Sequence, residues 1–188
     1  AKNQLILMLA SLCHDFGKPA VTLINDNGDV LAHKHALSGM NPSMDFLTRI
    51  KAPAAIIKRV LLLVQEHGAH FAEQESDQSV AWLANRLDPV SIELWEVLTE
   101  ADASGCYPLP AGRPALPWLE RAKTMGADKG RVKPMLTGKL LIKWGVEPSE
   151  HMGKVLKQAY AAQLNLQFND ETSAYSWFKK YHIACEKK

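Results

Sequence analysis

The sequence lacks the features that mark several common classes of protein. Its three cysteines, Cys13, Cys106 and Cys185, are odd in number and have no C-x-x-C spacing, which excludes a disulfide scaffold and a zinc knuckle. The longest apolar run, residues 5–13, is interrupted by Ser11 and is far shorter than the roughly 20 residues that cross a bilayer. No signal-peptide cleavage pattern, internal repeat or low-complexity stretch is present. We therefore expect a cytoplasmic protein that makes no contact with a membrane.

Net charge is also low, but the charges are unevenly distributed. The 188 residues carry a net charge of +2, and 47% of them are hydrophobic, which is enough for one sizeable core or two small ones. Residues 1–112 carry 8 basic and 13 acidic side chains, whereas residues 113–188 carry 14 and 7. This asymmetry predicts that residues 1–112 bind cations and that residues 113–188 bind a polyanion. Random drift among solvated charges is the alternative explanation.

Apolar periodicity predicts an all-α fold with one short interruption. The turn-rich tetrad from Asn25 to Gly28 separates two short apolar segments, so we expect a small hairpin or an irregular loop there. Six glycines and prolines within residues 105–117 predict a boundary between domain 1–109 and a helical tail, 110–188. The helices are expected over residues 5–12, 42–50, 53–66, 76–87, 89–102, 118–125, 137–144, 148–164 and from a cap at Asn169. Either Ser76 or Asp77 is expected to cap the helix that ends near residue 87.

Residues with metal-binding chemistry recur where the predicted helices end. The apolar helix over residues 5–12, which we expect to be buried, is followed by His14 and Asp15 and then broken at Gly17. Polar groups beside a core are costly unless they are paired or bound to a metal. The same placement recurs at His35, at His67 and His70 one helical turn apart, and at Asp102. Imidazole and carboxylate ligands together suit Zn, Mn, Ni, Fe or Mg.

Ordinary structural roles compete with this interpretation. A single His-Asp pair arises easily by chance, and His70 fits a surface residue as well as a residue that supports the site. Glu66 is expected to be a solvated helix charge, His33 a loop residue and Cys13 a small core residue.

Several motifs, taken together, resemble a known family. They are the string from Leu12 to Pro19, His35 with Gly39 and Pro42, Glu66-His67 with His70, and Ala101-Asp102 with Gly105. This series is similar to the HD domain of bacterial tRNA nucleotidyltransferases, the CCA-adding enzymes and poly(A) polymerases. The strings 136–139, 144–148 and 153–164 resemble the tail that follows that domain, so the resemblance covers most of the chain in the family's order.

The resemblance implies a function and roles for the site residues. It implies an HD-type, metal-dependent phosphohydrolase that acts on phosphomonoesters or 2′,3′-cyclic nucleotides, with a metal-activated water attacking phosphorus. Lys18 would neutralise charge that develops on the phosphate. The implied metal ligands are His14, Asp15, His35, His67 and Asp102, with Asp15, Lys18 and His67 taking part in catalysis and His70 in a supporting position.

The sequence also departs from the family. HD sites usually have a further histidine upstream of the doublet, and none of the 13 residues before His14 is a histidine. The strand-rich nucleotidyltransferase head is absent, so we do not expect this chain alone to add nucleotides. We expect it to be the C-terminal part of a longer protein or a fragment. Cys106 stands where the family often has Arg.

The basic half predicts contact with RNA. Residues 121–143 carry a net charge of +6, and such side chains give RNA-backbone affinity that falls with salt. Trp118 and Trp144 are expected to be core residues, with base stacking as the alternative. A second function is therefore a non-catalytic tRNA-binding module of a CCA-adding enzyme or poly(A) polymerase. The predicted RNA-binding residues are Lys123, Lys129, Arg131, Lys133, Lys139 and Lys143.

Overall fold

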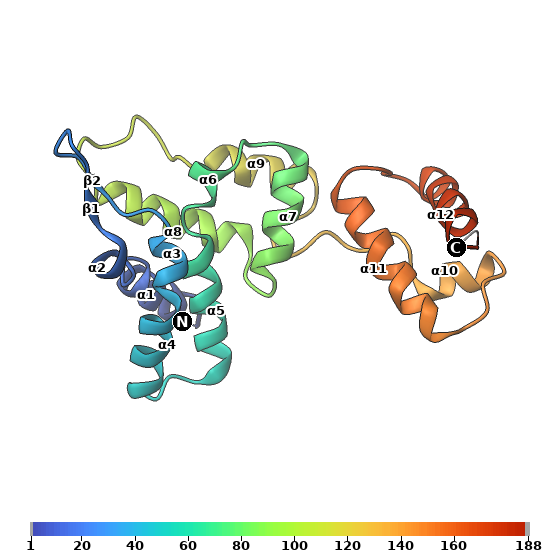
Figure 1. Cartoon of the computed structure of the whole chain (residues 1–188), viewed down its shortest axis with the longest axis horizontal. Coiled ribbons are helices and arrows are strands. Elements are labelled where there is room, and N and C mark those ends of the chain that lie inside the picture. The colour runs from blue at the N-terminus through green and yellow to red at the C-terminus, as the bar shows by residue number, and fades with distance from the viewer. Residues whose placement is uncertain (1, 187–188) are drawn as a thin grey trace. The chain divides into compact units, whose positions relative to one another are not determined.

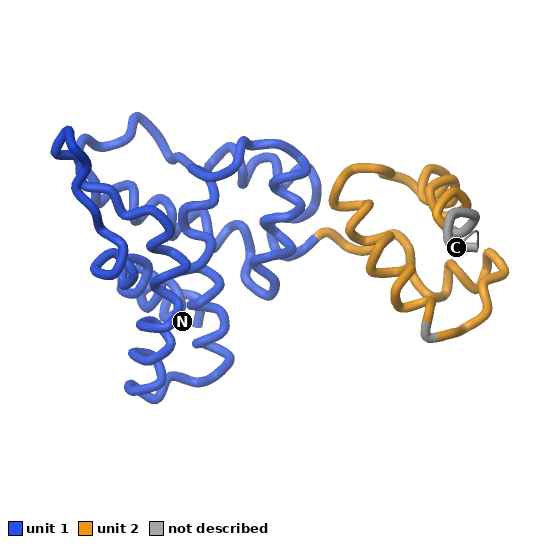
Figure 2. The backbone as a smooth tube through the Cα atoms, in the orientation of Figure 1, with its two compact units in different colours: residues 1–131 blue, residues 132–188 orange. Residues whose placement is uncertain are grey.

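The chain folds mostly into helices, as the periodicity predicts. The computed structural model describes residues 2–186 and their side chains except those of residues 150 and 182–186, so His182 and Cys185 have no described side chain. Two compact units, Ala1–Arg131 and Val132–Lys188, are coloured separately in Figure 2. The division falls later in the chain than the boundary expected at residue 109, because α9 (Leu116–Thr124) packs against α7 (Asp77–Leu87) and α8 (Ile92–Ser104) of the first unit. No described helix is long and apolar enough to span a membrane.

The helices of the first unit, whose arrangement Figure 1 shows, bury apolar side chains between them. Helix α1 (Lys2–Cys13) packs against α5 (Ala54–Glu66) and α8, and α5 also packs against α7. Trp95 of α8 is fully buried, and its indole N–H donates a hydrogen bond of 2.7 Å to the carbonyl of Glu66. The remaining elements of this unit are α2 (Lys18–Val21), β1 (Leu23–Ile24), β2 (Val30–Leu31), α3 (His35–Ser38), α4 (Met40–Arg49) and α6 (Ala69–Ala72).

The expected hairpin is confirmed. Strands β1 and β2 pair antiparallel, with Leu23 opposite Leu31 and Ile24 opposite Val30. The Asn25 side chain accepts hydrogen bonds from two backbone N–H groups of the turn, and Gly28 has a φ of 83°, which favours glycine. The hairpin therefore forms from local turn chemistry, and it delivers the chain to the start of α3.

The prediction that the first helix is buried is wrong for half of its surface. Ile6, Ala10 and Cys13 are fully buried, because one face of α1 rests on α5 and α8. The opposite face is exposed, with Met8 and Leu12 at 64% and 53%. An apolar sequence around the whole helix predicts burial only when every face has a neighbour, and periodicity does not reveal how many neighbours there are.

Some helices begin one or a few residues away from the predicted start. Helix α8 begins after Ser91, whose hydroxyl accepts from the Leu94 N–H, rather than at Pro89. The last helix, α12 (Glu171–Glu186), follows Asp170, whose carboxylate accepts from the Ser173 N–H, so the predicted cap at Asn169 is one residue early. Of the two caps expected for α7, Ser76 and Asp77, the structure has Ser76.

Two buried carboxylates are paired with arginines. Glu66 is 7% exposed, accepts from Arg86 at 2.9 Å and is not the solvated charge that the sequence predicted. Arg86 also binds Glu73 at 2.7 Å. Glu96, 1% exposed, accepts two hydrogen bonds from Arg113, which anchors the loop after α8. A carboxylate this deeply buried requires such a partner.

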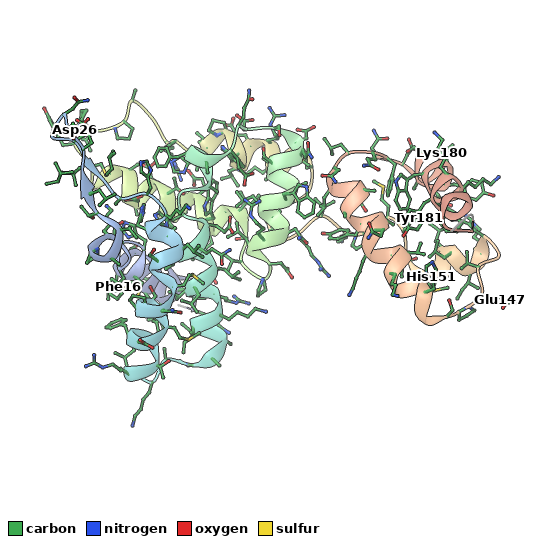
Figure 3. All side chains as sticks on the ribbon, viewed as in Figure 1. Phe16, Asp26, Glu147, His151, Lys180 and Tyr181 are labelled. Atoms are coloured by element: carbon green, nitrogen blue, oxygen red, sulfur yellow. The ribbon has the colours of Figure 1, made fainter. Side chains whose placement is uncertain are left out.

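The second unit has a small core of its own. The unit consists of α10 (Gly138–Lys143), α11 (Glu150–Leu164) and α12. These helices pack around core residues that include Leu141, Phe168 and Phe178. Trp144 packs against this core, and its ring lies 4.8 Å from that of Tyr175. Tyr181 packs against the same core, whereas the preceding residue, Lys180, is exposed (Figure 3).

Candidate metal centre

A close backbone approach brings the turn after α1 against α3. Helix α1 ends at Cys13, and the turn that carries His14 and Asp15 continues to Gly17. A Cβ atom on Gly17 would lie 2.0 Å from the His35 carbonyl oxygen and 2.5 Å from the Gly39 nitrogen. Only glycine therefore fits at residue 17. This contact places the Asp15 carboxylate beside the His35 imidazole, 20 residues further along the chain.

Three histidines have the same local geometry. The Nδ1 atoms of His14, His35 and His67 each lie 2.7 to 2.8 Å from a carbonyl oxygen three residues earlier. A carbonyl only accepts hydrogen bonds, so we assign the proton of each neutral ring to Nδ1. Each Nε2 is then left with a lone pair. Such backbone contacts are the means by which proteins orient metal-binding imidazoles.

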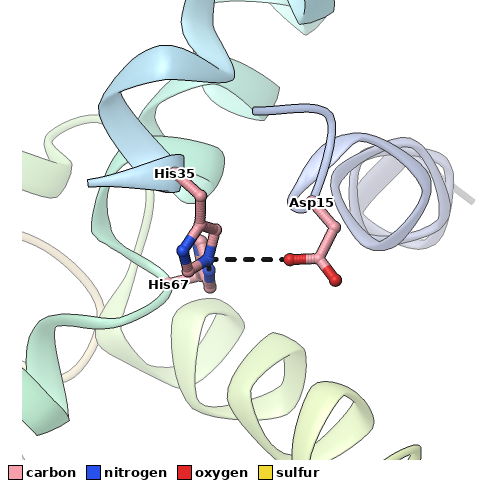
Figure 4. A group of neighbouring side chains, drawn as sticks. All are labelled: Asp15, His35 and His67. Carbon is pink, nitrogen blue, oxygen red and sulfur yellow. Dashed lines mark hydrogen bonds and ion pairs between the residues drawn. The ribbon is translucent and has the colours of Figure 1, made fainter. Parts of the chain in front are cut away.

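The Nε2 atoms of His35 and His67 point at each other. They are 2.9 Å apart, and an Asp15 carboxylate oxygen lies 3.6 Å from the His35 Nε2 (Figure 4). Ligand atoms of the three residues all lie within 4.8 Å of one another. Two lone pairs at 2.9 Å repel unless a proton or a cation lies between them. Burial lowers the pKa of His67, which disfavours a second proton on that ring. The arrangement therefore fits a bound metal cation.

The distance between the two imidazoles also fits a metal ion. Two nitrogens that are each about 2.1 Å from one ion are about 3.0 Å apart at a right angle and about 3.4 Å apart at the tetrahedral angle. The 2.9 Å between His35 and His67 is close to the right-angle value. An Asp15 carboxylate oxygen belongs to the same group of neighbouring atoms. Nitrogen and oxygen ligands together suit a divalent transition ion, whereas Mg prefers oxygen ligands alone.

His14 and Asp102 lie beside these three residues. The His14 Nε2 is 3.2 Å from an Asp102 oxygen and 3.3 Å from an Asp15 oxygen. The hydrogen bond with Asp102 raises the pKa of His14, and the same bond lowers the pKa of Asp102. Each shift thus favours the charged form of its group.

Lys18 and His70 complete the set predicted from the sequence. The Lys18 ammonium lies 2.6 Å from the second Asp15 oxygen, and its side chain is 49% exposed. The His70 ring packs against Phe71 and Trp95, with centroid distances of 3.7 and 6.2 Å, and burial lowers its pKa.

Two cavities flank the cluster. One, of about 340 Å³, is lined by His14, Asp15, Lys18, Asp102 and Cys106 among other residues. The other, of about 660 Å³, is lined by residues that include His35, His67, Phe71, Glu73 and Arg86. The imidazole of α3 and the one that follows α5 thus line one cavity, and the turn after α1 and the end of α8 line the other. Both volumes are large enough for a small phosphoester.

The basic residues predicted to bind RNA are all exposed, but they do not belong to one unit. Lys123, Lys129 and Arg131 lie in the first unit, and Lys133, Lys139 and Lys143 lie in the second. Trp118 is buried at 3% exposure against Trp95, so it is a core residue as expected.

Sequence reasoning missed two features of the site. The first is the contact between Gly17 and α3, for which the only signal was a glycine two residues after the doublet. The second is the Glu66–Arg86–Glu73 network in the wall of the larger cavity. Arg86 had no signal, because its partners lie 20 and 13 residues away.

Comparison with known proteins finds a distant relative. Over 160 residues the chain is 28% identical to a protein named A-adding tRNA nucleotidyltransferase from Deinococcus radiodurans. The match covers 82% of this chain and 36% of that protein, so the chain spans about a third of the length of the relative. No protein-family model matches, and no solved structure matches. The chain is thus related to a tRNA nucleotidyltransferase.

Proposed function

We propose that the first unit is an HD-type, metal-dependent phosphohydrolase that acts on phosphomonoesters or 2′,3′-cyclic nucleotides. The observation that carries the proposal is the pair of Nε2 atoms, on His35 and His67, that face each other at 2.9 Å beside Asp15. The resemblance of the sequence motifs to HD domains supports the same function. The name of the relative favours a tRNA nucleotidyltransferase-like protein as the setting of the reaction.

Each residue has a role that its position permits. Asp15, His35 and His67 hold a divalent ion, and His14 and Asp102 complete its surroundings. When bound, such an ion lowers the pKa of water and polarises a phosphoryl oxygen. Lys18 lies on the same cavity as Asp15 and Asp102, where its ammonium neutralises charge on a substrate phosphate.

Metal reconstitution tests the proposal. We expect the chelator-stripped chain to hydrolyse bis-p-nitrophenyl phosphate and 2′,3′-cyclic AMP only after Mn, Ni, Fe or Zn is added, with Mg less effective. The metal bound per chain is measured by mass spectrometry, and turnover is measured by product release. Turnover that is independent of metal, or a folded chain that retains no ion, contradicts the proposal. The helical circular dichroism spectrum confirms folding in each sample.

A second function, a non-catalytic tRNA-binding module, is favoured by a different observation. The six predicted RNA-binding side chains are exposed, and the relative is named for an activity on tRNA. Phosphate contacts from such residues give affinity that is independent of sequence and falls as salt rises. Both functions are compatible within one longer protein.

Charge reversal tests this second function. The double substitution Lys129→Glu and Lys133→Glu is expected to weaken tRNA binding and to reduce the slope of log affinity against log salt by about 2, because each phosphate that is no longer neutralised lowers the slope by about one unit. Filter binding or fluorescence anisotropy across a salt series measures both quantities. Lys58→Glu, at an exposed lysine of α5, is the control for charge reversal elsewhere on the surface and should leave the slope unchanged. An unaltered slope in the double variant would refute this function.

A further inference from the structure

The larger cavity has a wall that the proposed metal chemistry does not use. His35 and His67 form the part of its wall that belongs to the metal centre, and Phe71 lies on α6, four residues after His67. The cavity volume, about 660 Å³, exceeds what a bare phosphate fills and suits a mononucleotide. There is therefore space beside the metal centre for the rest of a substrate.

Phe71 is placed unusually for a large apolar side chain. It is 81% exposed, yet it lines this cavity rather than standing alone on an open surface. Its ring rests against the His70 imidazole at a centroid distance of 3.7 Å. The rest of the Phe71 ring remains open to a ligand.

The polar part of the same wall is held rigidly. Arg86 bridges the buried Glu66 and the half-buried Glu73, with hydrogen bonds of 2.9 and 2.7 Å. The wall thus combines an aromatic face with fixed carboxylate oxygens, and carboxylates accept hydrogen bonds from amino groups such as those at the edges of adenine, guanine and cytosine. A sugar phosphate has no planar group to occupy the aromatic face.

We propose that Phe71 is the platform on which the nucleobase of a substrate stacks while its phosphoester lies at the metal centre. The inference rests on the proposed function of that centre and makes the substrate class a nucleoside phosphoester. Phe71 would determine substrate specificity, because stacking of a base on its ring adds affinity that a phosphoester without a base does not gain. His35 and His67 connect the two parts of the site, since they belong to the metal cluster and line the base cavity.

A binding comparison tests the proposal without relying on turnover. Calorimetric affinities of the chelator-stripped chain, in which the proposed hydrolysis cannot consume the ligand, are measured for AMP and for ribose 5-phosphate, which share the phosphate and differ in the base. We expect AMP to bind at least about 10-fold more tightly, the size that stacking on an aromatic ring gives. Phe71→Ala should abolish this difference by weakening AMP alone, and Phe71→Trp should preserve it.

The controls separate this inference from the proposed function. Leu37→Ala removes another exposed apolar side chain, 67% exposed on α3, and should leave both affinities unchanged. Equal binding of AMP and ribose 5-phosphate, or AMP binding that is unaffected by Phe71→Ala, overturns the inference. Hydrolysis of bis-p-nitrophenyl phosphate is independent of a base, so its presence or absence decides the metal-dependent activity separately. Because Phe71 is exposed, the alanine variant should retain the wild-type circular dichroism spectrum.

Discussion

Replacing Asp15 by Asn is expected to remove metal-dependent phosphoester hydrolysis and to weaken metal binding by more than about 100-fold. Loss of a group that merely supports a ligand typically costs about 10- to 100-fold, and Asp15 is the carboxylate of the three-residue cluster itself. Its two oxygens face His35, His14 and Lys18, so an amide would also leave Lys18 without its anionic partner. Metal titration and turnover of bis-p-nitrophenyl phosphate measure the two effects.

Asp45→Asn is the matched control for this prediction. Asp45 lies exposed on α4 in the same unit, and its neutralisation changes the net charge by the same amount. Metal affinity and turnover should stay at the wild-type level in this variant. If Asp15→Asn binds metal as tightly as Asp45→Asn, the ion is held elsewhere and the proposed site is wrong. Purifying the two variants identically also exposes any contaminating phosphatase.

Replacing Gly17 by Ala is expected to destabilise the first unit by about 3 kcal/mol, at the upper end of the range for overpacking. The added Cβ would meet the backbone carbonyl of His35 at 2.0 Å, and backbone cannot rotate away as a flexible side chain can. Helix α3 must therefore shift, which moves His35 away from Asp15. We expect metal affinity to fall together with stability.

Urea unfolding followed by circular dichroism measures the change in stability, and metal titration below the unfolding transition measures the effect on the site. Gly39→Ala is the graded variant, because its Cβ would meet the Gly17 nitrogen and the His35 oxygen at 3.1 Å, and it should lie between wild type and Gly17→Ala. Gly112→Ala meets open space and should change neither quantity. Similar stabilities for Gly17→Ala and Gly112→Ala contradict the close approach.

The sequence predicted local features well where a short segment contains all the information. The α7 cap at Ser76 and the hairpin turn at Asn25 depend on hydrogen bonds that span five residues or fewer. The α5 helix follows from its apolar stripe and from Pro53 before it. The errors, at Pro89 and Asn169, concern which of several neighbouring residues caps a helix.

In the candidate site, too, the sequence predicted what short segments contain and not how distant segments meet. The sequence alone identified the residue types and positions of the cluster, since His14, Asp15, His35, His67 and Asp102 all stand at or near helix ends.

Only the tertiary structure decided which atoms meet. It brings His35 and His67 together across 32 residues, and it turns Glu66 from an expected surface charge into a buried partner of Arg86. It also leaves one face of α1 exposed. The physical reason is that periodicity and caps act within a few residues. These contacts instead depend on how separate helices pack, namely α1, α3, α5, α7 and α8. Close approaches such as the one at Gly17 determine that packing.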